Sequence, residues 1–170
     1  VIAVDIDVLS DTVAEVIRAI TEEMLGTAPE RIGAAPKTLF VYRCTAPISK
    51  IKTSIYDIGG GDACIEVLAE GQQFVASGIH PNTGKNYRWP GDSLLDYNSP
   101  EALTAVTPGE LEQFVAACNL ALADRGPLKS RSQSNNNIVR LDTGKPNFDF
   151  QENDPTTPTA KLRAAMDFIS

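Results

Sequence analysis

The sequence has no long hydrophobic run. None of its apolar stretches approaches the roughly 18 consecutive residues that a membrane-spanning helix needs. No basic segment followed by an apolar one opens the chain, so there is no sign of a secretory leader. We therefore expect no membrane partner and a cytoplasmic location.

Cysteine is also scarce. The three cysteines, Cys44, Cys64 and Cys118, lie far apart in the chain. An odd number at such separations fits neither a disulfide framework nor the paired spacing of a zinc site. We expect reduced thiols that are mostly buried.

A basic excess is missing as well. The formal net charge is −7, whereas proteins that bind nucleic acid usually gain affinity from contacts between basic residues and phosphate. The distribution is uneven, however. Between Pro29 and Ser54 five basic residues stand against the single acid Glu30, a local balance of 5 − 1 = +4. This segment predicts a basic face on an acidic protein, although an ordinary solvated surface would have the same composition.

The beginning of the chain has the pattern of a strand followed by a helix. Apolar residues recur at every second position through the first eight residues, which predicts a strand with one buried face. Asp5 and Asp7 lie on the opposite face. An amphipathic helix is expected to begin after Ser10, a capping residue, and to stop at Gly26.

Further strands are expected in the middle of the chain. Thr38–Arg43 is one, and Lys52–Ile58 is a weaker candidate. Ala63–Leu68 and Gln72–Ile79 have the composition of a hairpin joined by a Gly-containing connection. The residues from 81 to 84 then form a turn.

A second helix is expected to begin at Thr107, because Thr107 to Glu110 has the pattern of a capping box with proline at the first helical position. Strands and helices in this order predict an α+β domain. We expect a mixed or antiparallel sheet with both helices packed on one face. The open face would carry four candidate functional residues, which are Asp5, Asp7, Glu66 and His80.

The two aspartates of the first strand are the first candidate site. Asp5 and Asp7 would project from one face with their backbones about 6 to 7 Å apart, close enough to share cations. Oxygen ligands suit Mg²⁺ or Mn²⁺, and two such ions can stabilise both the entering and the leaving oxygen of a phosphoryl transfer. An Asp-x-Asp strand is also common on solvated faces, so that interpretation stays open.

Glu66 and His80 are two further candidates. Glu66 is an acid in an otherwise apolar strand, where it needs either solvent or a partner. His80 is the only histidine and could donate a hydrogen bond to a phosphate. With an odd number of loop residues the two would share a face of the predicted hairpin. An edge-strand glutamate and a surface histidine are the alternatives.

Three separated motifs together resemble a known family. They are Asp5-Ile6-Asp7, the basic segment from Arg31 to Arg43, and the run from Ile65 to Trp89, which contains Gly78-Ile79-His80. The combination resembles the bifunctional primase-polymerase (prim-pol) domains of phage, prophage and plasmid replication proteins, in the archaeo-eukaryotic primase superfamily. Gly78 stands where the family more often has serine, which removes a hydroxyl that could contact phosphate.

The resemblance implies a nucleotidyltransferase with an RRM-like catalytic half. Such an enzyme makes RNA or DNA primers and extends DNA on a single-stranded template, using nucleoside triphosphates and Mg²⁺ or Mn²⁺. Asp5, Asp7 and a third acid would hold the metal, the third being Glu66 or, alternatively, Asp92 or Asp96. The nucleotide would be bound by basic residues of the motifs, which are His80, Arg31, Lys37, Arg43 and Lys85.

The resemblance covers residues 1–125, the expected catalytic domain. The family has a portion before its Asp-x-Asp strand, so we expect that the N-terminal part of the domain is missing here. Residues 126–159 have the composition of a linker. Residues 160–170 regain helical spacing and resemble the start of the helical module that often precedes a helicase, which makes a fused or associated helicase an expected partner.

Two other functions fit the same residues. A non-catalytic replication module could keep the fold and use the basic face to bind nucleic acid. A metal-dependent nuclease could use the same acids to activate water instead of a 3′-hydroxyl.

Overall fold

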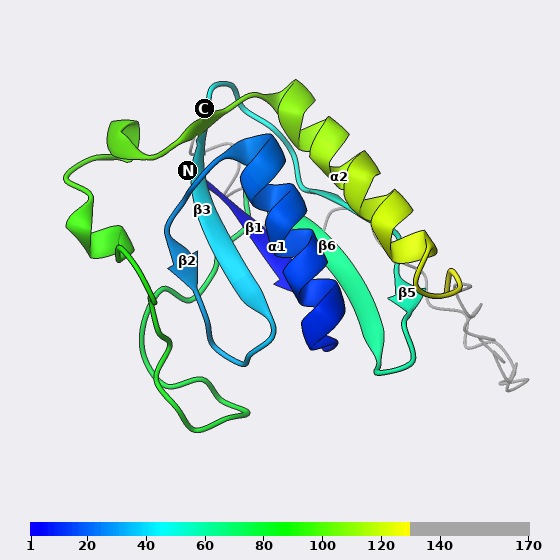
Figure 1. The fold of residues 1–170 in the computed structure, drawn as a ribbon. Coiled ribbons are helices and arrows are strands. Elements are labelled where there is room, and N and C mark those ends of the chain that lie inside the picture. The colour runs from blue at the N-terminus through cyan, green and yellow to red at the C-terminus, as the bar shows by residue number, and fades with distance from the viewer. Residues whose placement is uncertain (130–170) are drawn as a thin grey trace, which may run out of the picture. The chain divides into compact units, whose positions relative to one another are not determined.

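The structure is a computed structural model that describes residues 1–129. The expected helical module and most of the expected linker lie outside the described residues. In chain order the elements are β1 (Ile2–Asp7), α1 (Asp11–Leu25), β2 (Glu30–Arg31), β3 (Thr38–Cys44), β4 (Ile51–Lys52), β5 (Tyr56–Asp57), β6 (Asp62–Leu68), the 3₁₀ helices η1 (Leu94–Asp96) and η2 (Pro100–Ala102), β7 (Ala105–Val106) and α2 (Pro108–Ala123) (Figure 1).

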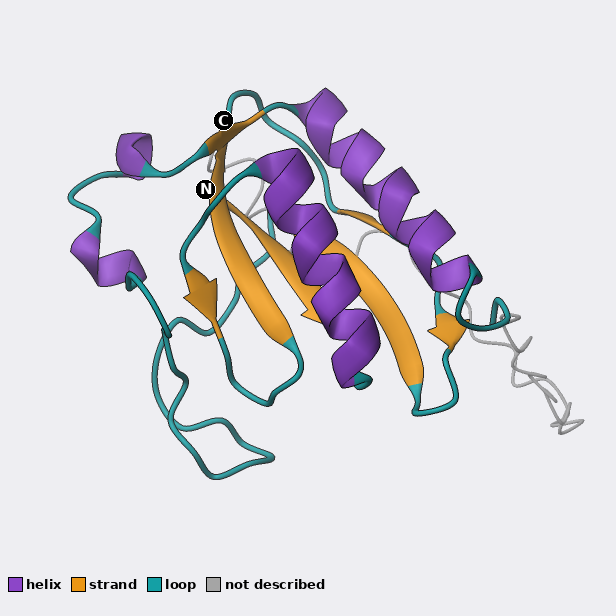
Figure 2. Cartoon of the chain, in the orientation of Figure 1, coloured by secondary structure: helices purple, strands orange, loops and turns teal. Residues whose placement is uncertain are grey.

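The described residues form one sheet with two helices on one side. The main strand order is β2-β3-β1-β6-β4, and all four of these pairings are antiparallel. The short β5 pairs with β6, and β7 runs parallel to β3, so the complete sheet is mixed. Figure 2 shows α1 and α2 side by side across the same face of the sheet. The predicted α+β class, with its helices on one face, is confirmed.

The main core lies between this face and the helices. Val4 and Ile6 of β1 and Ile65 of β6 are fully buried there, together with Ile17 of α1 and Phe114 of α2. Burying one such side chain contributes roughly 1.5 to 3 kcal/mol. The period-two pattern of the strands and the helical spacing of the two helices therefore meet in a single core.

Both helices begin as their sequences predict. The Ser10 hydroxyl accepts a hydrogen bond from the amide of Val13 at 3.4 Å, and Gly26 follows α1 with a φ of 79°, a value that glycine adopts without strain. Thr107 and Glu110 form the predicted reciprocal capping box of α2. Local capping signals thus set both ends of α1 and the beginning of α2.

The opposite face of the sheet is covered only in part. A second apolar cluster joins Ala3, Leu39 and Val41 of the sheet to Leu103, and partly buried side chains of the segment after β6 pack against it. Among these is Trp89, whose indole N–H donates to the carbonyl of Ala76 at 3.0 Å. The part of this face that carries Asp5 and Asp7 lies outside the cluster.

The predicted hairpin strand over Gln72–Ile79 is wrong. The segment forms no strand, and Val75 and Ile79 in it are 53% and 70% exposed. The reason is that β6 pairs with β1 on one side and with β4 on the other. No free edge remains along its length for a returning strand, so the chain leaves the sheet after Leu68.

The weaker strand prediction, Lys52–Ile58, is right only in part. Two short strands, β4 and β5, replace it, and both pair with β6. Thr53 lies between them and explains the interruption. Its amide donates to the carbonyl of Ile65, and its hydroxyl accepts from the amide of Ile65, so a side chain supplies one bond that a continuous ladder would otherwise make.

Within residues 1–129, no helix has both the length and the apolar character required to cross a membrane.

Candidate functional site

One row of the sheet places two acids between two bases. Asp5 lies opposite Glu66 of β6 on one side and opposite Leu39 of β3 on the other. Arg31 of β2 continues the row beyond Leu39, and Lys52 of β4 continues it beyond Glu66. Residues paired in register share a face, and this one is opposite the helices. Asp5 and Glu66 are therefore neighbours on the open face, as predicted, although not in the predicted hairpin.

Asp7 lies two residues further along the same face, where β1 ends. Its neighbour on β6 is Cys64. On the other side Lys37, which immediately precedes β3, places its ammonium 2.5 Å from Asp7 Oδ1. The side chains of Lys37 and Asp7 are 39% and 46% exposed, although the Oδ1 atom itself is buried.

A small pocket brings most of the predicted residues together. Its volume is about 160 Å³. Three parts of the chain line it: β1, the stretch from β2 to the start of β3, and the loop after β6. The lining residues are Asp5, Asp7, Arg31, Gly33, Ala34, Lys37, Thr38, His80 and Tyr87. Five of the nine were predicted from the sequence. They come from three segments that are far apart in the chain.

His80 reaches the pocket from a tight turn. The amide of Gly84 donates to the His80 carbonyl at 2.9 Å, which confirms the turn predicted over residues 81–84. The His80 ring nitrogen Nδ1 accepts hydrogen bonds from the amides of Asn82 and Thr83, each at 3.3 Å. Because Nδ1 is an acceptor, the proton of the neutral ring lies on Nε2. His80 therefore has one N–H donor to offer a ligand.

The turn is attached to the edge of the sheet. Ile32, just after β2, exchanges two backbone hydrogen bonds with Arg88, at 2.8 and 2.9 Å. Figure 1 shows this segment, drawn in green between β6 and the two 3₁₀ helices, passing the β2 side of the sheet. The attachment holds His80 beside the segment between β2 and β3.

Tyr87 and Gly33 belong to the pocket but were not singled out from the sequence. The guanidinium of Arg31 lies 4.5 Å from the centroid of the Tyr87 ring, and the rings of His80 and Tyr87 meet edge to face at 5.3 Å. Gly33 passes under both rings. A Cβ atom at this position would lie 2.4 Å from Tyr87 and 2.7 Å from His80, so only glycine fits without a shift.

Arg31 is held firmly on the pocket wall. Its Nη1 donates to the carbonyl of Val75 at 2.6 Å, while its Nε is buried and makes no hydrogen bond within the described residues. Burial lowers the pKa of the Arg31 guanidinium, and Tyr87 and Asp5 act in the opposite direction. Arg31 is thus a fixed cation next to the acids.

Burial raises the pKa of Asp5 above its usual value. The positive charge of Arg31 opposes this shift, the negative charges of Asp7 and Glu66 reinforce it, and Lys37 opposes it more weakly. A carboxylate that is both desolvated and crowded by like charges gains from a further cation. Within the described residues, Arg31 and Lys37 are the cations that act on Asp5 in this way.

Glu66 does not line the pocket, although it faces Asp5. Its carboxylate contacts the ammonium of Lys50 at 2.7 Å and that of Lys52 at 3.9 Å. Within residues 1–129, no group of three or more histidine, cysteine, aspartate or glutamate side chains is arranged to hold a metal ion.

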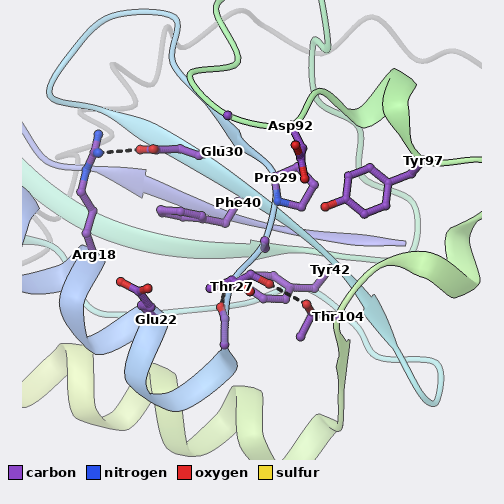
Figure 3. Close-up of a pocket in the computed structure, with 13 residues that line it drawn as sticks. Arg18, Glu22, Thr27, Pro29, Glu30, Phe40, Tyr42, Asp92, Tyr97 and Thr104 are labelled. Carbon is purple, nitrogen blue, oxygen red and sulfur yellow. Dashed lines mark hydrogen bonds and ion pairs between the residues drawn. The ribbon is translucent and has the colours of Figure 1, made fainter.

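The two alternative third acids lie apart from Asp5 and Asp7. Asp92 lines a different pocket, of about 460 Å³, between the later part of α1, the β2–β3 edge and the segment before α2. Figure 3 shows the Asp92 carboxylate beside Tyr97, on the opposite side of the view from the ion pair of Arg18 with Glu30. Neither this acid nor Asp96 is among the residues that line the pocket of Asp5 and Asp7. Asp96 instead accepts a hydrogen bond from the amide of Ser93 at 2.7 Å.

Arg43 and Lys85 are also outside the small pocket. Arg43 lies six residues beyond Lys37 along β3, a distance of about 20 Å in an extended chain, and its amide donates to the carbonyl of Thr104. Lys85 lies in the His80 turn with an exposed side chain. The structure therefore separates these two from the three basic residues that line the pocket.

The three cysteines are free, as predicted, but only Cys118 is buried, whereas Cys44 and Cys64 are partly exposed. Cys64 lies opposite Asp7, and burial, followed by the charges of Asp7 and Glu66, raises the pKa of its thiol to about 11. Burial alone raises the pKa of Cys118 to about 12. Both thiols are therefore protonated at neutral pH and are poor nucleophiles.

The donor set of the pocket is compatible with Mg²⁺ or Mn²⁺. Asp5 and Asp7 supply hard oxygen ligands, and magnesium sites with one or two protein carboxylates are completed by water and substrate phosphates. The ammonium of Lys37 already places a cation against Asp7 Oδ1. Comparisons of the chain with protein-family models, with curated proteins and with solved structures found no match.

Proposed function

We propose that this chain is a primase-polymerase, a nucleotidyltransferase that makes RNA or DNA primers and extends DNA on a single-stranded template. One observation carries the proposal: Asp5 and Asp7 share a pocket with Arg31, Lys37 and His80. Acids that suit a divalent ion and bases that suit a triphosphate are both needed for nucleotidyl transfer, and here they line one space.

The residues divide into two roles in this proposal. Asp5 and Asp7 would hold Mg²⁺ or Mn²⁺, which when bound lowers the charge of the triphosphate and the pKa of the attacking hydroxyl. Lys37 and the Nε2–H of His80 would hold the phosphates, and Arg31 would add a fixed positive charge. The 3′-hydroxyl oxygen would lose its proton to solvent and form a bond to the α-phosphorus, while the bond from the α-phosphorus to the bridging oxygen breaks and pyrophosphate leaves. The chain's own contribution is orientation and fixed charge.

Glu66 is the third acid that we propose, because it is the cross-strand neighbour of Asp5. Its contact with Lys50 would have to open before it could bind a metal. Asp92 and Asp96 are not among the residues that line the pocket of Asp5 and are weaker candidates. An RRM-like catalytic half, and a fused or associated helicase as partner, belong to the same proposal.

Primer extension tests the function. The full chain is given a 5′-labelled primer on a single-stranded template, deoxynucleotides and Mn²⁺, and the products are separated by length. We expect Asp5→Asn and Asp7→Asn each to reduce extension by about 100-fold or more, since stabilisation of developing charge usually contributes more to catalysis than any other effect. Asp62→Asn is the matched control, because Asp62 lies on β6 but pairs with Lys129. Undiminished extension by both site variants, with circular dichroism unchanged, would refute the proposal.

A non-catalytic nucleic-acid-binding module is the second candidate function. It is favoured by one observation, that two of the acids already contact cations of the chain, Asp7 with Lys37 and Glu66 with Lys50. Such a module would bind single-stranded DNA equally well with and without Mg²⁺ and nucleotide, and it would incorporate nothing. The same gel separates the nuclease alternative, because a nuclease shortens the labelled strand instead of lengthening it.

A further inference from the structure

Lys37 occupies a position that matters for cation binding. It is held where the chain enters β3, with its amide donating to the carbonyl of Ala34 at 3.1 Å. From there its ammonium reaches Asp7 Oδ1 at 2.5 Å. Both side chains line the small pocket and both are partly exposed. One carboxylate oxygen of Asp7 is therefore already in contact with a cation of the protein.

Lys37 differs in this respect from the other cation of the pocket. Arg31 donates a hydrogen bond to the carbonyl of Val75, lies over the Tyr87 ring and is about half buried. Lys37 is tied by one ion pair between partly exposed side chains, and exposed pairs are worth only about 0.2 to 1 kcal/mol. A lysine ammonium on its flexible stem can move away at small cost.

An ammonium and a divalent ion repel each other strongly when both contact one carboxylate. A metal that binds Oδ1 of Asp7 thus displaces Lys37. A triphosphate in the same pocket would give the displaced ammonium a new anionic partner. The new contact between Lys37 and the triphosphate would offset the loss of its contact with Asp7, but only when metal and triphosphate bind together.

We propose that Lys37 is the resident counter-ion of Asp7, exchanged for a divalent ion when a nucleoside triphosphate binds and transferred to the phosphates of that nucleotide. This inference rests on the proposed function and adds that binding of the metal and binding of the nucleotide depend on each other. Metal alone binds weakly, and metal and nucleotide each strengthen the binding of the other by the same factor, as thermodynamic linkage requires.

Binding of Mn²⁺ to the full chain tests the exchange without any reaction. Free Mn²⁺ is measured by electron paramagnetic resonance, with and without a nonhydrolysable nucleoside triphosphate. We expect Lys37→Met to bind Mn²⁺ alone roughly 1.5- to fivefold more tightly than the original chain, because a competing cation is gone. The nucleotide also chelates Mn²⁺ by itself, so Mn²⁺ bound by nucleotide without protein is subtracted. The remaining factor by which nucleotide strengthens Mn²⁺ binding to the chain should be smaller in Lys37→Met than in the original chain.

Two controls make the outcome specific. Lys129→Met removes another surface ammonium, which lies 2.6 Å from Asp62, and should leave Mn²⁺ binding unchanged. Lys37→Arg keeps a cation and should keep the weak binding. Lys37→Gln repeats the test with a polar side chain of similar length, and thermal unfolding of each variant confirms that it is folded.

Unchanged or weaker Mn²⁺ binding in both Lys37→Met and Lys37→Gln would overturn the exchange. Asp7→Asn distinguishes this result from a failure of the proposed function. When Asp7→Asn abolishes Mn²⁺ binding but the Lys37 variants change nothing, the metal site stands and the counter-ion role is refuted. When Asp7→Asn binds Mn²⁺ as tightly as the original chain, the metal site itself is refuted, and the exchange with it.

Discussion

Asp5→Asn should make the protein more stable at neutral pH while it removes the proposed activity. Asp5 sits in the middle of the acidic row, opposite Glu66 and two residues from Asp7. Burial raises its pKa from the ordinary value of 3.8, so the folded chain holds its ionised form at a cost. Asparagine has nearly the same shape and carries no charge to desolvate.

The expected gain is about 0.5 to 2 kcal/mol in the free energy of unfolding, the range usual for removing a functional but unfavourable group. For a chain of this size that corresponds to roughly 2 to 4 °C in the unfolding midpoint per kcal/mol. The loss of the attraction between Asp5 and Arg31 keeps the gain at this modest level, because that contact is the largest effect opposing burial.

The pH dependence has a definite sign. Because the pKa of Asp5 is raised in the folded chain, the folded state binds this proton more tightly than the unfolded state does. Stability contributed by this group is therefore present below its unfolded pKa and lost as pH rises through the folded pKa. The advantage of Asp5→Asn should be full at pH 7 and should vanish near and below the unfolded value.

Urea unfolding of the original chain and of Asp5→Asn at pH 7 and near pH 4 measures both effects. Asp62→Asn, at an exposed position, should change stability by less than about 0.5 kcal/mol at either pH. The reasoning is refuted if Asp5→Asn is less stable than the original chain at pH 7. It is equally refuted if the gain is as large near pH 4 as at pH 7.

Two more substitutions test how the site and α2 are built. Gly33→Ala would force the rings of Tyr87 and His80 apart, so we expect a loss of about 1 to 3 kcal/mol in urea unfolding, together with weaker binding of a fluorescent nucleotide; unaltered binding would show that the rings do not shape the pocket. Thr107→Ala removes the capping box with Glu110 and should cost about 1 kcal/mol of stability with nucleotide binding unaffected, whereas a change in binding would contradict a purely structural role.

The sequence was sufficient for elements whose signals are local. Alternation of apolar residues predicted β1, and the caps at Ser10, Gly26 and Thr107 predicted helix ends that the structure has. It also predicted that Asp5 and Asp7 lie on the face away from the helices. These features follow from the geometry of one strand or one helix and need no knowledge of the neighbours.

The sequence was insufficient where pairing between distant segments decides whether a segment forms a strand or reaches the pocket. Composition over Gln72–Ile79 is that of a strand, but the edges of β6 are taken by β1 and β4. The two-residue β2 is too short to show a period. Tyr87 and Gly33 reach the pocket only because the loop is attached to the edge of the sheet at Ile32, and nothing near either residue in the sequence indicates that attachment.

The pocket depends on the apolar cluster beside it. His80 and Tyr87 are carried by a loop without regular strands, and ordering such a loop costs backbone entropy at every residue. The compensating contacts are apolar: Phe74 and Trp89 pack against Leu39 and its neighbours on the same sheet face. The apolar cluster on one part of the open face thus holds the loop in place beside the part that carries Asp5 and Asp7. A change in that cluster should therefore weaken ligand binding in the pocket before it unfolds the domain, because a loop opens locally at a smaller free-energy cost than the helical core.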